Sequence, residues 1–252
     1  MRRMMWVLVI AIGGLGATAS VGHGAETSFD RVLPLASGGQ FALENVNGSV
    51  QVDGWEREAV EICAIKTGEH AAAELDQVKI DIQSGPGRVA VHTIYPPGDG
   101  VPVVVEYHIH VPYRVLLASV ATVNGSVHVS GVRGVGDLRT INGDVRVVSS
   151  SGRFNGHTTN GDVHLELKQV SEGAPMEVGT VNGSVLLELP ADIGASLHVQ
   201  NLNGGFDSEF PIGSKASVTS QVFRGTLGKG GSELYLSAMN GSIRLVIDRS
   251  TV

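Results

Sequence analysis

A short phrase recurs along the chain and limits the folds open to it more than any other feature. Each copy is an Asn-Gly pair that is usually followed by a polar residue and then by Val, as in ATVNGSVHV and RTINGDVRV. The pairs are Asn47-Gly48, Asn124-Gly125, Asn142-Gly143, Asn160-Gly161, Asn182-Gly183, Asn203-Gly204 and Asn240-Gly241. The central spacings from Asn to Asn are 18, 18, 22 and 21 residues, and the last spacing, from Asn203 to Asn240, is 37 residues. A period near 20 residues is typical of stacked structural repeats.

The residues after each pair alternate in polarity. The third residue after Asn is apolar in every copy, and the fifth is apolar in all except the Asn203 copy, which has Ser208. The residues between them are Gln51, His128, Arg146, His164, Leu186, Asp207 and Arg244. This period of two predicts a short strand with one buried face in each copy. The residues before Asn are expected to end the preceding strand and point inward; examples are Val123, Ile141, Val181, Leu202 and Met239.

Asn-Gly pairs have a specific backbone chemistry. Gly adopts positive φ because it lacks Cβ, and Asn tolerates the left-handed region better than most residues. In a hairpin such a pair reverses the chain, whereas in a stack of coils it makes a sharp corner. Stacked corners would place Asn on Asn, and an Asn ladder can form hydrogen bonds along the stack. We therefore expect all seven pairs to be structural turns.

These patterns predict an all-β protein, specifically a β-solenoid resembling a parallel β-helix, with corners at the Asn-Gly pairs. A sandwich of consecutive hairpins is the alternative, because it uses the same turn signal. Residues 118–249 would form the repeat region. Residues 26–117 have longer alternating strands and one helix-forming stretch, EHAAAELDQV at 69–78. They are expected to form an N-terminal β subdomain that caps the solenoid and contains one short helix.

The first residues have the pattern of a secretory signal peptide. A basic start is followed by an apolar run and then by small residues, which predicts a signal peptide at 1–19 with cleavage after Ala19, or alternatively after Ala25. The apolar run is shorter than the roughly 20 residues of a membrane span, so no stable span is expected after cleavage. Removal of two arginines leaves 16 basic and 25 acidic residues, a net charge of about −9. This charge argues against nucleic acid as a partner.

Candidate chemical sites are few. Glu106, His108 and His110 share one face of a predicted strand and could hold a metal, but a solvated polar face is the simpler interpretation, so no metal site is predicted. His128 and His164 would lie two coils apart, too far for one metal. Asp144 and Asp162 are not part of a repeated calcium-binding nonapeptide, and we interpret them as turn-capping side chains.

Catalytic residues and cofactors are not predicted. Cys63, the single cysteine, lies in an alternating apolar run and is interpreted as a small core residue. No nucleophile elbow occurs, and the outward positions of the repeats hold no paired carboxylates for glycan cleavage. The sequence thus favours a protein that is not an enzyme.

Several segments together resemble the bacterial DUF4097 family of adhesin-like β-strand repeat proteins. They are VQVDGW at 50–55, VEYHIHVP at 105–112 and the T-x-NG-[SD]-V repeats. The resemblance covers nearly the whole chain after the signal peptide and implies an exported protein of the cell envelope. It transfers no catalytic residue. Fold resemblance alone does not define a function.

Three functions follow from these interpretations. The favoured one is an adhesin-like or envelope-associated binding module in the periplasm or on the cell surface, with an unknown protein or glycan ligand. The alternative is a structural or stress-sensing partner protein in the periplasm. The third is a glycan-active β-helix enzyme.

Overall fold

The computed structural model describes residues 25–68, 72–98, 101–212, 217–218 and 221–250. Within them the fold is all-β with almost no helix, as the sequence predicts. Twenty strands form one hydrogen-bonded, nearly closed sheet, and the one helix described is α1 (Ala72–Leu75). Helix α1 is shorter than the predicted stretch 69–78, whose first residues fall outside the described ranges. The expected signal peptide also lies outside the described residues. Among the described helices, none is long and apolar enough to cross a membrane.

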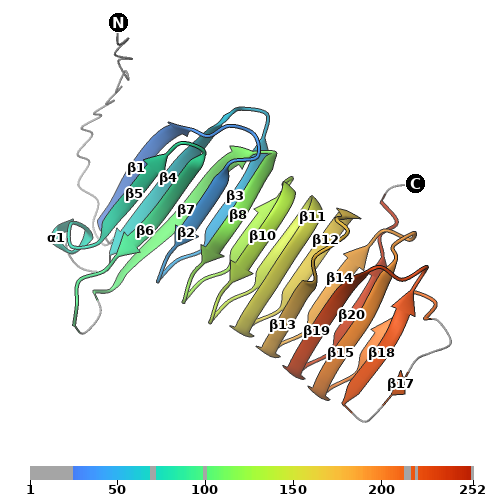
Figure 1. The fold of residues 1–252 in the computed structure, drawn as a ribbon. Coiled ribbons are helices and arrows are strands. Elements are labelled where there is room, and N and C mark those ends of the chain that lie inside the picture. Colours follow the sequence, from blue (N-terminus) through green and yellow to red (C-terminus); the bar gives the residue numbers. More distant parts are fainter. Residues whose placement is uncertain (1–24, 69–71, 99–100, 213–216, 219–220, 251–252) are drawn as a thin grey trace, which may run out of the picture.

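The strands form two rows that pack against each other as an elongated stack (Figure 1). In stacking order, row one contains β5 (Lys79–Gly85), β6 (Arg88–Ile94), β2 (Gln40–Glu44), β8 (Arg114–Ala121), β10 (Arg133–Arg139), the second half of β11 (Val145–Asn160), β13 (Met176–Asn182), β19 (Ser232–Asn240), β15 (Ala195–Asn203), β18 (Val222–Leu227) and β17 (Ser217–Val218). Row two contains β1 (Ala25–Pro34), β4 (Ala59–Gly68), β7 (Val103–Pro112), β3 (Val50–Trp55), β9 (Val127–Ser130), the first half of β11, β12 (Val163–Val170), β14 (Val185–Leu189), β20 (Ile243–Ile247) and β16 (Phe206–Ser208).

The repeats pair in parallel and in register through the middle of the stack. In row two, Val127 pairs with Val145, Val145 with Val163, Val163 with Val185, and Val185 with Ile243. Because side chains alternate along a strand, this register puts the same face of every repeat into the core. All five residues are at most 1% exposed.

The last repeats stack out of chain order. Strand β19 lies between β13 and β15, and β20 lies between β14 and β16. The chain reaches β19 from β18, which pairs antiparallel with β15. The layer made of β19 and β20 is therefore inserted between two layers that precede it in sequence, as the red and orange strands of Figure 1 show.

The prediction that residues before Asn point inward is wrong for several copies. Ile141, Leu202 and Met239 are 45%, 43% and 47% exposed. The buried position is instead two residues before Asn, where Thr140 is 5% exposed. Strand alternation explains the difference, because a buried residue at that position turns the next side chain outward.

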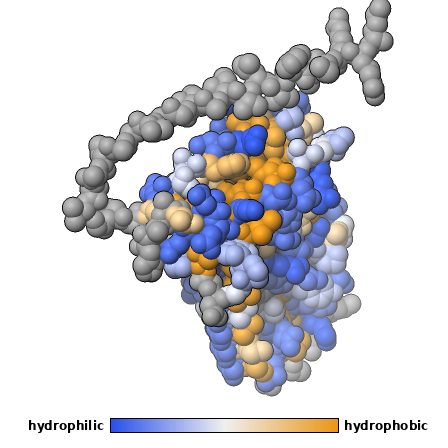
Figure 2. Space-filling view, turned by 90° about the vertical axis from the view of Figure 1, so that its left-hand side faces the viewer, coloured by the Kyte–Doolittle hydropathy of each residue, from blue (hydrophilic) through white to orange (hydrophobic). Residues whose placement is uncertain are grey.

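Antiparallel strands end the stack at its N-terminal side. The outermost strands there are β1, paired with β4, and β5, paired with β6. Figure 2 shows apolar surface gathered at this end of the molecule. The partly buried Phe29 and Leu33 of β1 and Ile80 and Ile82 of β5 pack against the core there. This end therefore leaves part of the core incompletely covered by the described strands.

Candidate functional site

The seven Asn side chains form one continuous ladder at a single edge of the stack, the Asn edge. Asn47 only accepts, and the Nδ2 of each of the other six donates to the Oδ1 of the Asn in the layer before it at 2.7–2.9 Å. The stacking order is Asn47, Asn124, Asn142, Asn160, Asn182, Asn240 and Asn203. Even the two copies that are out of chain order join the ladder. Exposed hydrogen bonds of this kind add about 0.5–1.5 kcal/mol each.

The glycines of these pairs have two physical reasons to be Gly. Gly143 has a φ of 149°, and five of the other six glycines have φ between 119° and 154°. Residues with a Cβ rarely adopt such a positive φ. A Cβ on Gly143 would also lie 2.2 Å from the carbonyl oxygen of Gly125 in the layer before it. Gly204 lacks the positive φ, yet its Cβ would lie 1.8 Å from the carbonyl oxygen of Gly241. Sequence reasoning found the first reason and missed the second.

A second ladder, of buried Thr side chains, lies beside the first and was missed from the sequence. Thr140 Oγ1 donates to the Gly125 carbonyl at 2.7 Å. Equivalent bonds of 2.8–2.9 Å are formed by Thr122, Thr158 and Thr180. The recurrent Thr two residues before Asn is the signal that could have revealed it. A buried carbonyl that loses its donor costs about 1–3 kcal/mol, so these hydroxyls stabilise the corners.

Asp144 and Asp162 accept hydrogen bonds from the backbone of the next layer. Asp144 Oδ1 accepts the Asp162 N–H at 2.8 Å, and Asp162 Oδ1 accepts the Ser184 N–H at 2.7 Å. They thus bridge layers rather than cap their own turns. Within the described ranges, no three His, Cys, Asp or Glu residues are grouped as metal ligands would be.

The three candidate metal ligands on β7 point outward and have separate surroundings. Glu106 and His108 are exposed, whereas His110 stacks on Trp55 with ring centroids 5.0 Å apart. His110 Nδ1 lies 3.1 Å from a carboxylate oxygen of Glu61 on β4. His110 is thus placed for a stacking contact with Trp55 rather than for a metal site shared with Glu106 and His108.

Cys63 is not the core residue that the sequence suggested. It is half-buried on the outer side of β4, because the inward positions of that strand are its neighbours Ile62 and Ala64. Burial and a hydrogen bond with Asp30 raise the pKa of the thiol to about 11. A thiol with that pKa stays protonated at neutral pH and is a poor nucleophile.

The outward positions of row two form a mixed polar row with a shallow groove of about 380 Å³. His128, Arg146 and His164 are in adjacent register, and His164 Nε2 lies 2.7 Å from Glu188 Oε1. Burial, with Arg146 beside it, lowers the pKa of His128 and so disfavours the protonated form of its ring. Two arginines and the two bridging aspartates share this groove, which leaves no strong excess of one charge.

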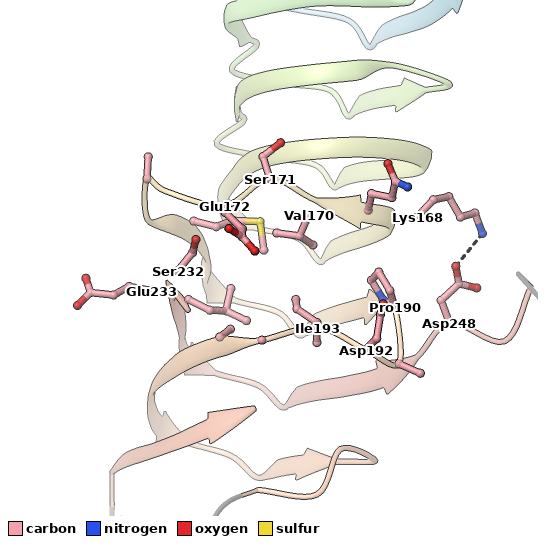
Figure 3. A pocket seen from close by; sticks show the side chains of 17 residues that line it. Lys168, Val170, Ser171, Glu172, Pro190, Asp192, Ile193, Ser232, Glu233 and Asp248 are labelled. Carbon is pink, nitrogen blue, oxygen red and sulfur yellow. Dashed lines mark hydrogen bonds and ion pairs between the residues drawn. The ribbon is translucent and has the colours of Figure 1, made fainter. Parts of the chain in front are cut away.

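A larger cavity of about 610 Å³ lies at the edge opposite the Asn ladder. We call it the corner slot. It opens between the β12–β13 connection and the β14–β15 connection, and its lining includes the first residues of β19. Figure 3 shows Val170, the last residue of β12, and Ile193, in the β14–β15 connection, facing each other across it. Met176 and Leu234, which are 3% and 2% exposed, add apolar floor.

Charged side chains surround the corner slot unevenly. Its lining has four carboxylates, Glu172, Asp192, Glu233 and Asp248, and one cation, Lys168. Lys168 Nζ lies 2.6 Å from a Glu166 oxygen and 3.0 Å from an Asp248 oxygen, and these contacts raise its pKa. Hydrogen bonds from Ser250 and then from Lys168 outweigh burial and lower the pKa of Asp248 to about 2.

The chain is similar to solved bacterial proteins and to a known family. A "putative cell adhesion protein" from Clostridium sporogenes ATCC 15579 is 12% identical, with a TM-score of 0.48 over 88% of this chain and 100% of that one. A "putative adhesin" from Bacteroides fragilis NCTC 9343 is 10% identical, with a TM-score of 0.42 over 87% and 97% of the two chains. A search of curated proteins finds no match. The family model described as Toastrack DUF4097 matches residues 32–246, and the chain therefore belongs to this family.

Proposed function

We propose that this chain is an exported, non-enzymatic β-solenoid that acts as an adhesin-like or envelope-associated binding module. The observation that carries the proposal is the corner slot, an open cavity with apolar walls and an excess of carboxylates on a regular β-stack. Cavities of this size and composition are typical of binding sites. Rigid surroundings favour binding because little conformational entropy is lost when the ligand arrives.

The parallel register and the continuous Asn ladder support the solenoid interpretation. In it the seven Asn-Gly pairs are structural corners rather than parts of a binding site. Residues 26–117 act as the N-terminal β subdomain, because their antiparallel strands end the stack. Residues 118–249 are the repeat region.

Surface exposure tests the adhesin-like role. An epitope-tagged chain in intact source cells is treated with protease, and lysed cells serve as the control. We expect digestion of the intact cells' protein from outside. Protection until lysis would contradict surface exposure and favour a periplasmic partner protein.

Export has its own measurement. The secreted or envelope fraction should contain a chain that begins at Ser20, or at Glu26 if cleavage follows Ala25. A chain that keeps Met1 would contradict the expected signal peptide.

A further inference from the structure

We propose that the corner slot binds an extended peptide segment that carries a Lys or Arg side chain. The inference rests on the proposed function, because it names the ligand class of that binding module.

The slot exists because of the inserted layer. Strands β19 and β20 join at an Asn-Gly corner on the Asn edge, as every other repeat does. On the opposite edge, β19 is entered from the antiparallel strand β18 instead of from a row-two strand. At this edge the layer of β19 and β20 therefore has no chain connection from row two to row one, such as the β12–β13 and β14–β15 connections. The corner slot lies at this place.

The geometry of the slot matches an extended chain. β19 separates the starts of β13 and β15, so in front of the first residues of β19 the two flanking connections lie about two strand spacings apart, roughly 9–10 Å, and the gap narrows toward β12 and β14, which pair directly with each other. A gap of that width has room for one extended backbone, which would take the place of the missing connection. Val170, Ile193 and Leu234 offer apolar contacts to its side chains.

The charges of the slot select a basic ligand. Lys168 is already paired with Glu166 and Asp248, so it offers no free positive charge. The exposed carboxylates of Glu172 and Asp192 have neither an ion pair nor a hydrogen bond with any described residue. A Lys or Arg side chain would neutralise them, and its aliphatic stem would contact the apolar walls.

Other ligand classes fit less well. A free anion would meet four carboxylates against one neutralised ammonium group. A sugar ring commonly stacks on an aromatic side chain, and none of the residues that line the slot is aromatic. A basic peptide uses both the apolar and the acidic parts of the lining.

A peptide-binding assay tests the proposal on the purified mature chain. The probe is a fluorescein-labelled Val-Lys-Val-Lys-Val peptide, and binding is followed by fluorescence anisotropy. The matched peptides Val-Gln-Val-Gln-Val and Val-Glu-Val-Glu-Val keep the length and apolar residues while changing the charge. We expect the Lys peptide to bind at least tenfold more tightly than the Gln peptide and the Glu peptide to bind most weakly. Binding should weaken as NaCl rises from 50 to 500 mM, because salt screens exposed charge pairs.

The variant that tests the site is Glu172→Gln with Asp192→Asn. Loss of two carboxylate contacts should weaken binding of the Lys peptide about tenfold. The control variant, Glu56→Gln with Glu58→Gln, removes the same net charge from the exposed β3–β4 connection at the other end of the stack. It should change binding less than twofold. Unchanged circular dichroism spectra and melting temperatures would show that all variants are folded.

Two outcomes would overturn the proposal. One is equal binding of the Lys and Gln peptides, or no binding of either. The other is an equal loss of binding in the slot variant and in the control variant, which would mean that net charge alone attracts the peptide. Either result leaves the binding-module function standing with another ligand. Protease protection in intact cells would instead contradict the surface role while leaving the peptide result intact.

Discussion

The replacement Gly143→Ala tests the stacking of the corners most directly. The added Cβ would lie 2.2 Å from the Gly125 carbonyl oxygen, and the alanine would have to adopt a φ of 149°. Backbone strain of that kind costs about 1–3 kcal/mol, and overpacking against a rigid neighbour costs about as much again. The layers could separate only by stretching hydrogen bonds such as Gly125 N–H to the Asn142 carbonyl, which is 2.9 Å long. We expect a loss of about 4 kcal/mol in the free energy of unfolding.

Two matched variants divide this cost into its parts. Gly173 has a φ of 113°, and no atom lies within 4 Å of the place that a Cβ would take, so Gly173→Ala tests backbone strain alone. Gly204 lacks the positive φ but would place its Cβ 1.8 Å from the Gly241 carbonyl oxygen, so Gly204→Ala tests the contact alone.

Urea unfolding followed by far-ultraviolet circular dichroism measures all three. The midpoint of Gly143→Ala should fall by more than about 1 M, and by more than that of either matched variant. If Gly143→Ala were no less stable than Gly173→Ala, the argument that each corner packs on the carbonyl of the layer before it would be refuted.

Three further predictions concern stability. Thr140→Val keeps the shape of the side chain but leaves the Gly125 carbonyl without its donor, so the free energy of unfolding should fall by about 1–3 kcal/mol in urea melts. Ala238 occupies the ladder position of these threonines and is 3% exposed. Ala238→Thr should supply a hydroxyl to the Gly183 carbonyl and raise the melting temperature, whereas Ala238→Val should not. The pKa of Asp248 is lowered from 3.8 to about 2, so its ionised form is favoured in the folded state. The stability that it contributes is fully present above about pH 4 and is lost as pH falls through about 2. Asp248→Asn should remove this part of the pH dependence between about pH 5 and pH 2, as measured by urea midpoints.

Much of the fold could be predicted from the sequence because its strongest signals are local. Alternation after each Asn-Gly pair predicts strands with one buried face, and Val127, Val145 and Val163 are indeed fully buried. The Thr ladder could have been predicted as well, since a recurrent Thr at one position in a strand needs a partner when it is buried. The sequence prediction places the residue directly before Asn in the core. The buried residue is instead the Thr two positions before Asn, and alternation along the strand then turns the next side chain outward.

The corner slot could not be predicted from the sequence. Its residues come from the end of β12, the β12–β13 and β14–β15 connections, the starts of β13, β15 and β19, and Asp248 after β20, and none of Val170, Ile193 or Glu233 belongs to a motif. The slot depends on the order of layers, and the long spacing of 37 residues from Asn203 to Asn240 does not reveal where the chain re-enters the stack. Long-range pairing is decided by which layer offers a matching edge, which periodicity does not describe.

The out-of-order layer connects the regular and irregular parts of the molecule. The Asn and Gly positions of each repeat are so alike that β19 can occupy a place between β13 and β15 and keep the register of both. Asn240 joins Asn182 on one side and Asn203 on the other at 2.7 and 2.9 Å. The same uniformity of the Asn edge allows the opposite edge to lose a corner without disturbing the core. A cavity can therefore form beside an intact Asn ladder. Its floor residues Met176 and Leu234 still pair with each other across β13 and β19, whereas its exposed residues Glu172 and Asp192 lie in the connections and take no part in strand pairing.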